Sequence, residues 1–277
     1  MLLICRAIMS LLQNASFQTT VLDMNKNNTI SRLWVGQPLH FCCMALLLVL
    51  VYMAWKYIGE PLPIVFWSAV AFPVMHQIFV WLTWRLELHS GAISKSIGFH
   101  RYLVFFFLLF SGRFITLLTL AWIDRGSLNL PIFLLAILTT LLALPGIYAM
   151  YSVKKYFGMA RAAGVDHFDL RYREMPLVKK GIFRFTSNGM YLYAFLLFWA
   201  IAVGLNSIAA LIVAAFSHVY IWVHYYATEK PDMDILYNMA YKNMFGHMIS
   251  HGQPVYRLIQ EGHVPGKNFI RFSIKLK

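Results

Sequence analysis

The last apolar segment of the chain ends with four side chains whose types suit catalysis or the binding of a charged ligand. They are His218, Trp222, Tyr225 and Glu229. An α-helix turns by about 100° per residue, so the spacings between these residues place them on one face. On that face an imidazole can exchange a proton near neutral pH, and a carboxylate can pair with a cation. The pattern predicts a polar site at the end of an otherwise apolar helix.

A belt of aromatic residues at a membrane boundary is an alternative explanation of Trp222, Tyr225 and Tyr226. This alternative requires neither His218, which lies about three turns further into the helix, nor the single glutamate that follows the aromatic residues. We therefore favour a functional site, with Glu229 as its anionic end.

The composition places this site in a protein that spans a membrane. Of the 277 residues, 60% are hydrophobic and 13% are charged, whereas globular domains average about 25% charged residues. Long apolar runs with few charges are typical of transmembrane helices. The chain is therefore predicted to be an all-α, polytopic membrane protein with about six transmembrane helices. The predicted spans are residues 40–57, 62–84, 102–123, 131–153, 190–205 and 207–227.

The net charge of +13 is concentrated in a few segments. Residues 153–188 contain eight basic and three acidic residues, and a second basic segment follows the last span. The basic residues of the first segment are Lys154, Lys155, Arg161, Arg171, Arg173, Lys179, Lys180 and Arg184. Since basic residues in short loops stay on the cytoplasmic side, both termini and both basic segments are predicted to be cytoplasmic. Membrane topology explains these charges better than nucleic-acid binding does.

The first four predicted spans carry almost no ionisable residues inside them, away from their ends. The exceptions are His76 in the second span and Arg113 in the third. An arginine inside a membrane is costly, so Arg113 is a functional candidate. A structural pair with a carbonyl or a headgroup phosphate is the alternative role. The three cysteines show no spacing typical of a metal site or a disulfide framework.

A polar segment precedes the fifth predicted span. Gly181 and Gly189 allow a close approach of the backbone, and the guanidinium of Arg184 suits a carboxylate or phosphate. Asn188 can offer its amide to a ligand. An ordinary loop, with Ser187 or Asn188 as the cap of the next helix, explains the same residues.

Residues from about 145 to 237 resemble the integral-membrane methyltransferases, namely the phospholipid N-methyltransferases and the isoprenylcysteine carboxyl methyltransferases. "MPLVKKGIF" is similar to that family's loop and turn, "SNGMYLY" to its Asn-Pro-Met-Tyr-x-Gly block, and "YATEKPDMDILY" to its E-x-P-x-x-x-x-[IL]-Y motif. Three positions depart from the family pattern. Gly189 replaces a proline, Tyr193 replaces a glycine, and Lys230 replaces a second glutamate.

The resemblance implies that S-adenosylmethionine binds on the cytoplasmic side. Glu229 would pair with the α-amino group of this cofactor, and aromatic faces would favour its sulfonium. The remaining cofactor-binding residues that the resemblance implies are Leu177, Val178, Gly181, Arg184, Asn188 and Tyr191.

The predicted activity is methyl transfer to a membrane-embedded amphiphile, with His218 and Glu229 as catalytic residues. Arg113, Trp222 and Tyr225 are predicted to bind this acceptor. A phospholipid amine is the first choice of acceptor, a prenylcysteine carboxylate the second, and a sterol-like amphiphile the third. A small transporter and a non-catalytic scaffold on the same fold are the other hypotheses. No metal and no nucleic-acid partner is expected.

Four segments are predicted along the chain. Residues 1–37 form an N-terminal interfacial segment, and residues 38–144 form the first four spans on the acceptor side. Residues 145–237 form the methyltransferase core, and residues 238–277 form an amphipathic segment with a basic tail. The sequence leaves the oligomeric state open, and the membrane can be that of the endoplasmic reticulum or a bacterial inner membrane.

Overall fold

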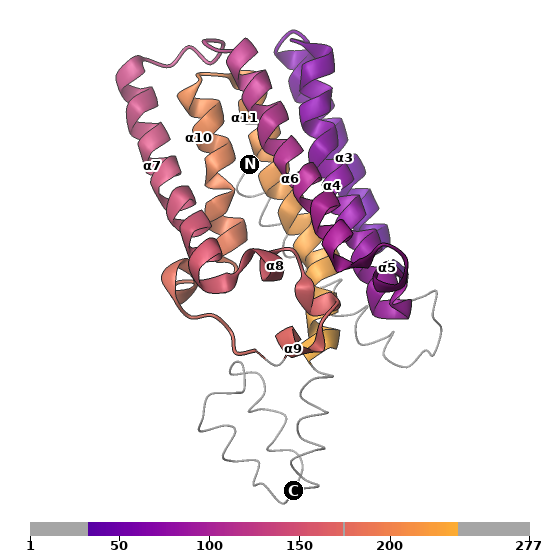
Figure 1. Ribbon diagram of the computed structural model, residues 1–277. Helices are drawn as coiled ribbons and strands as arrows, with labels where there is room; N and C mark the ends of the chain where they lie inside the picture. Colours follow the sequence, from indigo (N-terminus) through magenta and orange to yellow (C-terminus); the bar gives the residue numbers. More distant parts are fainter. Residues whose placement is uncertain (1–32, 174, 238–277) are drawn as a thin grey trace, which may run out of the picture.

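The computed structural model describes residues 33–173 and 175–237, and these residues form a bundle of helices without strands (Figure 1). The long α-helices are α3 (Gln37–Tyr57), α4 (Pro63–Ser90), α6 (Gly98–Ile123), α7 (Ile132–Ser152), α10 (Leu196–Gly204) and α11 (Ile208–His224). The short α-helices are α5 (Ala92–Ser96), α8 (Met159–Ala162) and α9 (Leu170–Arg173). Three π-turns, η1 (Val153–Phe157), η4 (Met190–Ala194) and η5 (Tyr225–Glu229), and two 3-10 turns, η2 (Val165–His167) and η3 (Gly181–Arg184), complete the described chain.

Five of the described helices are long and apolar enough to cross a membrane by length and composition. They are Gln37–Tyr57, Pro63–Ser90, Gly98–Ile123, Ile132–Phe157 and Ile208–Tyr237. The other apolar helix, Met190–Gly204, is shorter than a typical span. The prediction of an all-α, polytopic membrane protein is confirmed, and this short helix is the fifth of the six predicted spans. The second predicted span was too short, because α4 continues past Trp84 to Ser90 and so includes Arg85 and Glu87.

Helix α11 lies in the interior of the bundle and packs against α3, α4, α6 and α10, while α7 and α10 pair on one side (Figure 1). The first part of its buried face carries small residues, namely Ala209, Ala210 and Ala214, each 0% exposed. Small side chains let helix backbones approach closely, which favours packing inside a membrane. This face explains how one helix can contact four neighbours.

Hydrogen bonds between buried polar side chains also tie α3 to α11 and to η5, the π-turn that continues α11. Gln37 donates its amide to the Thr228 hydroxyl at 3.1 Å, and its amide oxygen lies 2.8 Å from Nδ1 of His40. The other ring nitrogen of His40 lies 3.0 Å from the Tyr220 hydroxyl. Because apolar surroundings make an unpaired polar group expensive, these bonds fix α3 in one position along α11.

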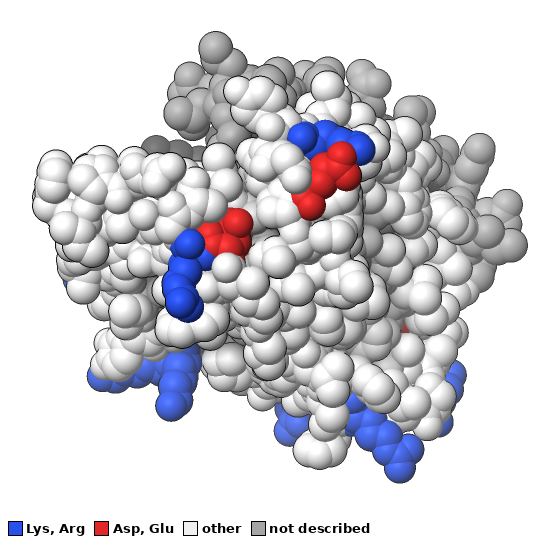
Figure 2. Space-filling view, turned by 90° about the horizontal axis from the view of Figure 1, so that it is seen from above, with Lys and Arg blue, Asp and Glu red and all other residues white. Residues whose placement is uncertain are grey.

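Asp124 follows α6 and lies at the end of the bundle where short loops join α3 to α4, α6 to α7 and α10 to α11. There it accepts hydrogen bonds from the start of α11. Its Oδ2 accepts hydrogen bonds from the Ser207 hydroxyl at 2.6 Å and from the Ala209 backbone N–H at 3.0 Å. Ser207 also caps α11 by accepting a bond from the Ala210 N–H at 3.1 Å. A carboxylate is favoured at a helix N-terminus. Figure 2 shows this end, where acidic and basic side chains form small mixed groups near the centre of a mostly uncharged surface.

The opposite end of the bundle, which we call the basic end, contains α5, α8, α9 and the turns between α7 and α10 (Figure 1). The basic segment 153–188 therefore lies at one end of the bundle, as its sequence predicts. That this end faces the cytoplasm stays a prediction. The predicted interfacial helix before residue 33 and the predicted amphipathic tail 238–277 lie outside the described residues, and the four-segment division stays a prediction.

The crossing of α4 and α6 gives a test of the bundle's packing. A Cβ added at Gly112 would lie 2.2 Å from Cε1 of Phe72, so Gly112→Ala forces the ring or the helices apart. Overpacking of this kind costs about 1–3 kcal/mol, and we expect a lower melting temperature in detergent. Ser111→Ala, at the exposed neighbouring position on α6, is the matched control. Equal melting temperatures for the two variants would contradict the close crossing.

Candidate functional site

A contact between Tyr191 and Glu229 joins two polar segments at the basic end of the bundle. One segment precedes the fifth predicted span, and the other follows the last. The Tyr191 hydroxyl donates a hydrogen bond to Oε2 of Glu229. The Tyr191 ring centroid lies 5.6 Å from that of Tyr225 and 6.1 Å from that of Trp222. Asn188 lies close enough to the Tyr225 hydroxyl to interact with it electrostatically. The structure thus brings together five of the predicted site residues, and we call this group the Tyr191–Glu229 site.

Two π-turns shape this site from both sides. Tyr191 belongs to η4 (Met190–Ala194), and Tyr225 and Glu229 belong to η5 (Tyr225–Glu229). A π-turn inserts an extra residue into a helical turn, and such turns are frequent at functional sites. Periodicity at 3.6 residues per turn could not locate these π-turns, because each shifts the helix register by one residue.

His218 lies deeper in the bundle than Glu229 and contacts α10. Nε1 of Trp199 donates a hydrogen bond to Nδ1 of His218 at 3.1 Å, and the Phe195 ring stacks on the imidazole at 5.5 Å. The imidazole also lies close to the backbone of Tyr191. The lone pair that a general base needs is therefore occupied at Nδ1. The catalytic role of His218 stays a prediction.

The turn at Gly181 is held against the end of α7. Its φ of 61° lies in the left-handed region, and a Cβ there would lie 2.5 Å from the Ser152 hydroxyl oxygen. The same hydroxyl accepts a hydrogen bond from the Ile182 N–H at 3.1 Å. Val178 packs against the cluster that contains Ile182, whereas the Leu177 side chain is exposed. The cofactor-binding roles of these residues stay predictions.

The Arg184 side chain makes no contact with the Tyr191–Glu229 site among the described residues. It is exposed in η3, and its guanidinium makes no hydrogen bond or ion pair within residues 33–173 and 175–237. Its position leaves the guanidinium available to a ligand at the basic end. The prediction that it lines the cofactor pocket is therefore carried only by the resemblance.

A buried ionic cluster that the sequence did not reveal lies next to this site. Nε of Arg85 lies 2.6 Å from Oδ1 of Asp232, and Nε2 of His167 lies 3.5 Å from Oδ2 of the same carboxylate. Asp166 contacts the other nitrogen of His167 at 3.3 Å, and the Trp84 ring stacks on the imidazole at 4.1 Å. We call these five residues the Asp232 cluster.

The Asp232 cluster connects three parts of the chain around Glu229. Arg85 comes from α4, His167 from η2, and Asp232 from the helical extension of α11. Glu229 lies within electrostatic range of Asp166, His167 and Asp232. One signal of the cluster was visible in the sequence, because Asp232 follows Glu229 by three residues and so lies on a similar helix face. The partners could not be inferred, because they lie far away in the sequence.

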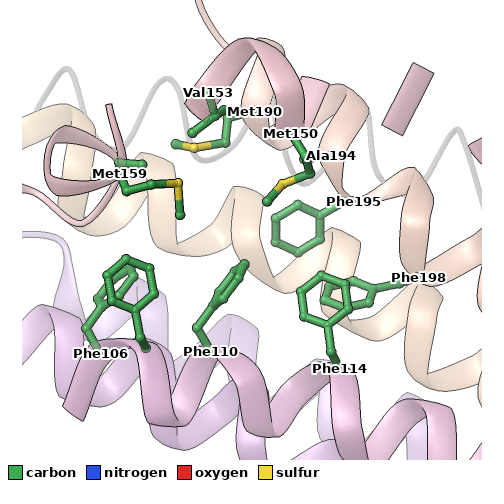
Figure 3. A pocket seen from close by; sticks show the side chains of 12 residues that line it. Phe106, Phe110, Phe114, Met150, Val153, Met159, Met190, Ala194, Phe195 and Phe198 are labelled. Atoms are coloured by element: carbon green, nitrogen blue, oxygen red, sulfur yellow. The ribbon is translucent and has the colours of Figure 1, made fainter. Parts of the chain in front are cut away.

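An apolar pocket lies between α6 and the pair formed by α7 and α10 (Figure 3). Phenylalanines of α6 and α10 face methionines of α7, α8 and η4 across it. The labelled rings and thioethers are Phe106, Phe110, Phe114, Phe195, Phe198, Met150, Met159 and Met190. Such a lining suits hydrocarbon. In the sequence these residues look like ordinary membrane-span residues, so their pattern did not predict a pocket.

Comparison with known proteins identifies a family for part of the chain. A family model described as phospholipid methyltransferase matches residues 134–240, which contain the whole Tyr191–Glu229 site. The resemblance to membrane methyltransferases is thereby confirmed for this part of the chain, whereas Arg113 lies outside it. The searches of curated proteins and of solved structures gave no match. Together with the five long apolar helices, the family match indicates an integral membrane protein.

The Asp232 cluster gives a pH-dependent prediction. Burial by itself lowers the pKa of His167, but hydrogen bonds and charges from Asp166 and Asp232 outweigh burial and raise the pKa from 6.5 to about 9. A raised folded-state pKa means that the protonated imidazole stabilises the fold. This contribution is complete below pH 6.5 and is lost as the pH rises to about 9.

We therefore expect the melting temperature of the unmodified protein to fall more steeply between pH 6.5 and 9 than that of the His167→Gln variant. Scanning fluorimetry in detergent over this range measures the difference. His89→Gln, which changes a histidine outside the cluster, should leave the steep fall unchanged. Parallel pH profiles for the unmodified protein and His167→Gln would show that His167 is not held protonated.

Proposed function

We propose that the protein is an S-adenosylmethionine-dependent methyltransferase that acts on a membrane amphiphile, most directly a phospholipid amine headgroup. The observation that carries this proposal is the hydrogen bond between Tyr191 and Glu229. It joins the two segments that resemble the methyltransferase motifs into one site, within the range that matches the phospholipid methyltransferase family.

The residues at this site fit the chemistry of the cofactor. S-adenosylmethionine carries an ammonium, a carboxylate and a sulfonium, and it supplies a methyl group that is already activated for transfer. Tyr191 fixes one oxygen of the Glu229 carboxylate, which leaves Oε1 for the ammonium. The rings of Tyr191, Trp222 and Tyr225 lie within about 6 Å of one another, and their faces attract a sulfonium. The exposed Arg184 is our candidate for the carboxylate.

The turn at Gly181 would present the backbone of Leu177 and Val178 to the adenosine. Ser152 holds this turn through the Ile182 N–H, so the turn cannot shift without breaking a buried hydrogen bond. The Asp232 cluster holds η2 against α4 and the extension of α11. These contacts would keep the loop and the Glu229 carboxylate in a constant relative position, which methyl transfer requires.

The acceptor would place its hydrocarbon in the pocket between α6, α7 and α10. The pocket is bounded at the basic end by Met159, Ala162 and Met190, and Met190 directly precedes Tyr191. An amphiphile in this pocket would have its polar end beside the Tyr191–Glu229 site and its hydrocarbon away from water. Exclusion of water prevents loss of the methyl group to hydrolysis.

An ammonium headgroup must lose a proton before it can accept a methyl group, and His218 is the proposed base. Its Nδ1 accepts the Trp199 N–H, so it can take a proton only after the indole moves. This occupied nitrogen favours a second candidate acceptor, the carboxylate of a prenylcysteine, because a carboxylate attacks without losing a proton.

The cofactor assignment is tested by isothermal titration calorimetry with S-adenosylmethionine and detergent-purified protein. We expect Glu229→Gln to weaken binding about tenfold or more, because a hydrogen bond to a charged group contributes about 1.5–3 kcal/mol. Tyr191→Phe should weaken it less, since the carboxylate remains. Glu60→Gln, at an exposed carboxylate in the link between α3 and α4, is the matched control.

Unchanged affinity in Glu229→Gln would refute the assigned role of this carboxylate. Failure of the folded, unmodified protein to bind the cofactor would refute the proposed function and would favour a non-catalytic scaffold or a transporter.

The proton-transfer step is tested with a labelled methyl group and membrane lipid extracts. With an amine acceptor, His218→Asn should reduce turnover about 100-fold or more while cofactor affinity stays constant. Trp199→Phe removes the donor to Nδ1 and should retain activity. If both variants turn over a lipid amine as fast as the unmodified protein, His218 is not the base. A labelled methyl ester in place of a labelled amine would favour the second candidate.

A further inference from the structure

Arg113 is a buried cation whose hydrogen-bonding groups are only partly used. It is 2% exposed in the interior of α6, and its Nη1 donates to Nδ1 of His76 at 3.2 Å. Its Nε and Nη2 have no hydrogen-bond partner among the described residues. The ion pairs of the described chain do not include it. A buried guanidinium without a counter-ion is costly, especially in a membrane.

The unused atoms form an arrangement that matches a carboxylate. The Nε–H and Nη2–H bonds of a guanidinium lie side by side along one edge, and this edge binds the two oxygens of a carboxylate together. Since Nδ1 of His76 accepts from Arg113, the proton of a neutral His76 is on Nε2, and Nε2 also lacks a partner. All three unused groups are therefore donors, so the missing partner is an acceptor with negative charge.

The apolar pocket lies directly beside this pair. The Phe195 and Phe198 rings contact the guanidinium of Arg113 at 5.2 and 5.6 Å, and the Phe106 ring contacts His76 at 4.7 Å. The same three rings line the pocket, and Figure 3 shows them facing its interior. One layer of aromatic rings therefore separates the apolar pocket from the guanidinium of Arg113, which has no counter-ion among the described residues.

We propose that the pocket and the Arg113–His76 pair together form a binding site for a single-chain lipid acid. The carboxylate binds the Nε and Nη2 edge of Arg113 and receives a further hydrogen bond from Nε2 of His76. The hydrocarbon chain lies in the pocket along α6. From Phe106 to Phe114 the pocket extends about 12 Å, at 1.5 Å per helical residue, which matches a chain of about ten carbons.

Binding of an anion here is favoured because folding has already removed Arg113 from water. The carboxylate loses its own hydration, but it gains a bidentate bond and a charge partner in surroundings of low dielectric constant. The aromatic rings must change rotamer to admit the carboxylate, which is a local movement. The chain would occupy space that the proposed acceptor also uses, so a lipid acid would compete with that acceptor.

The test compares three ten-carbon probes, namely decanoate, decanol and decylamine, on detergent-purified full-length protein without S-adenosylmethionine. Because no cofactor is present, the result does not depend on the proposed methyl transfer. Equilibrium binding of each radiolabelled probe is measured. We expect decanoate to bind at least tenfold more tightly than decanol, and decylamine to bind no better than decanol.

Variants then identify the groups that cause the preference. Arg113→Gln should abolish the preference for decanoate over decanol, and Arg113→Lys should reduce it, because an ammonium lacks the two-donor edge. Phe110→Trp narrows the pocket and should weaken all three probes together. Arg125→Gln, at an exposed arginine in the link between α6 and α7, is the matched control and should bind like the unmodified protein.

Equal affinities of the unmodified protein for decanoate and decanol would overturn the proposal, and this comparison requires no variant to fold. Persistence of the preference in folded Arg113→Gln would overturn it as well. Cofactor titration of Arg113→Gln separates the two proposals, because its affinity for S-adenosylmethionine should remain that of the unmodified protein even when decanoate binding is lost.

Discussion

The constraint on which the structure depends is that a polar group inside an apolar bundle must find a partner within the chain. Gln37 and His40 on α3 meet this requirement through Thr228 in η5 and Tyr220 on α11, and Asp124 meets it at the N-terminus of α11. Because water is absent from a bilayer interior, these groups have no alternative partner if a helix shifts. Each bond therefore also fixes the position of one helix along another. Arg113 meets the requirement only in part, which is why it points to a ligand.

The same constraint explains why the Tyr191–Glu229 site lies at the basic end of the bundle. A carboxylate such as Glu229 is tolerated next to hydrocarbon when a neighbour such as Tyr191 donates to it. The Asp232 carboxylate needs two partners, Arg85 and His167, and it is completely buried. Tyr191 and Glu229 both lie in π-turns, η4 and η5, and it is from these turns that the two side chains meet.

Hydrophobic runs predicted every long helix of the bundle, because length and apolarity are sufficient to identify a membrane span. The prediction failed at the second span, where Arg85 and Glu87 continue α4 beyond the apolar run. Both side chains are buried, and their partners, Asp232 for Arg85 and Ser94 for Glu87, remove the cost that normally ends an apolar helix. Charge alone could not reveal this, since it depends on contacts that form only in the folded chain.

The sequence by itself determined the helical class, the segregation of basic residues to one end, and the motifs at Asn188–Tyr191 and Glu229. These properties follow from composition and local spacing, which need no knowledge of distant contacts. Only the tertiary structure decided that Tyr191 donates to Glu229, that Trp199 occupies Nδ1 of His218, and that phenylalanines from α6 and α10 enclose a pocket beside Arg113. Each of these facts depends on the relative position of different helices, which close packing determines and which periodicity along one helix cannot specify.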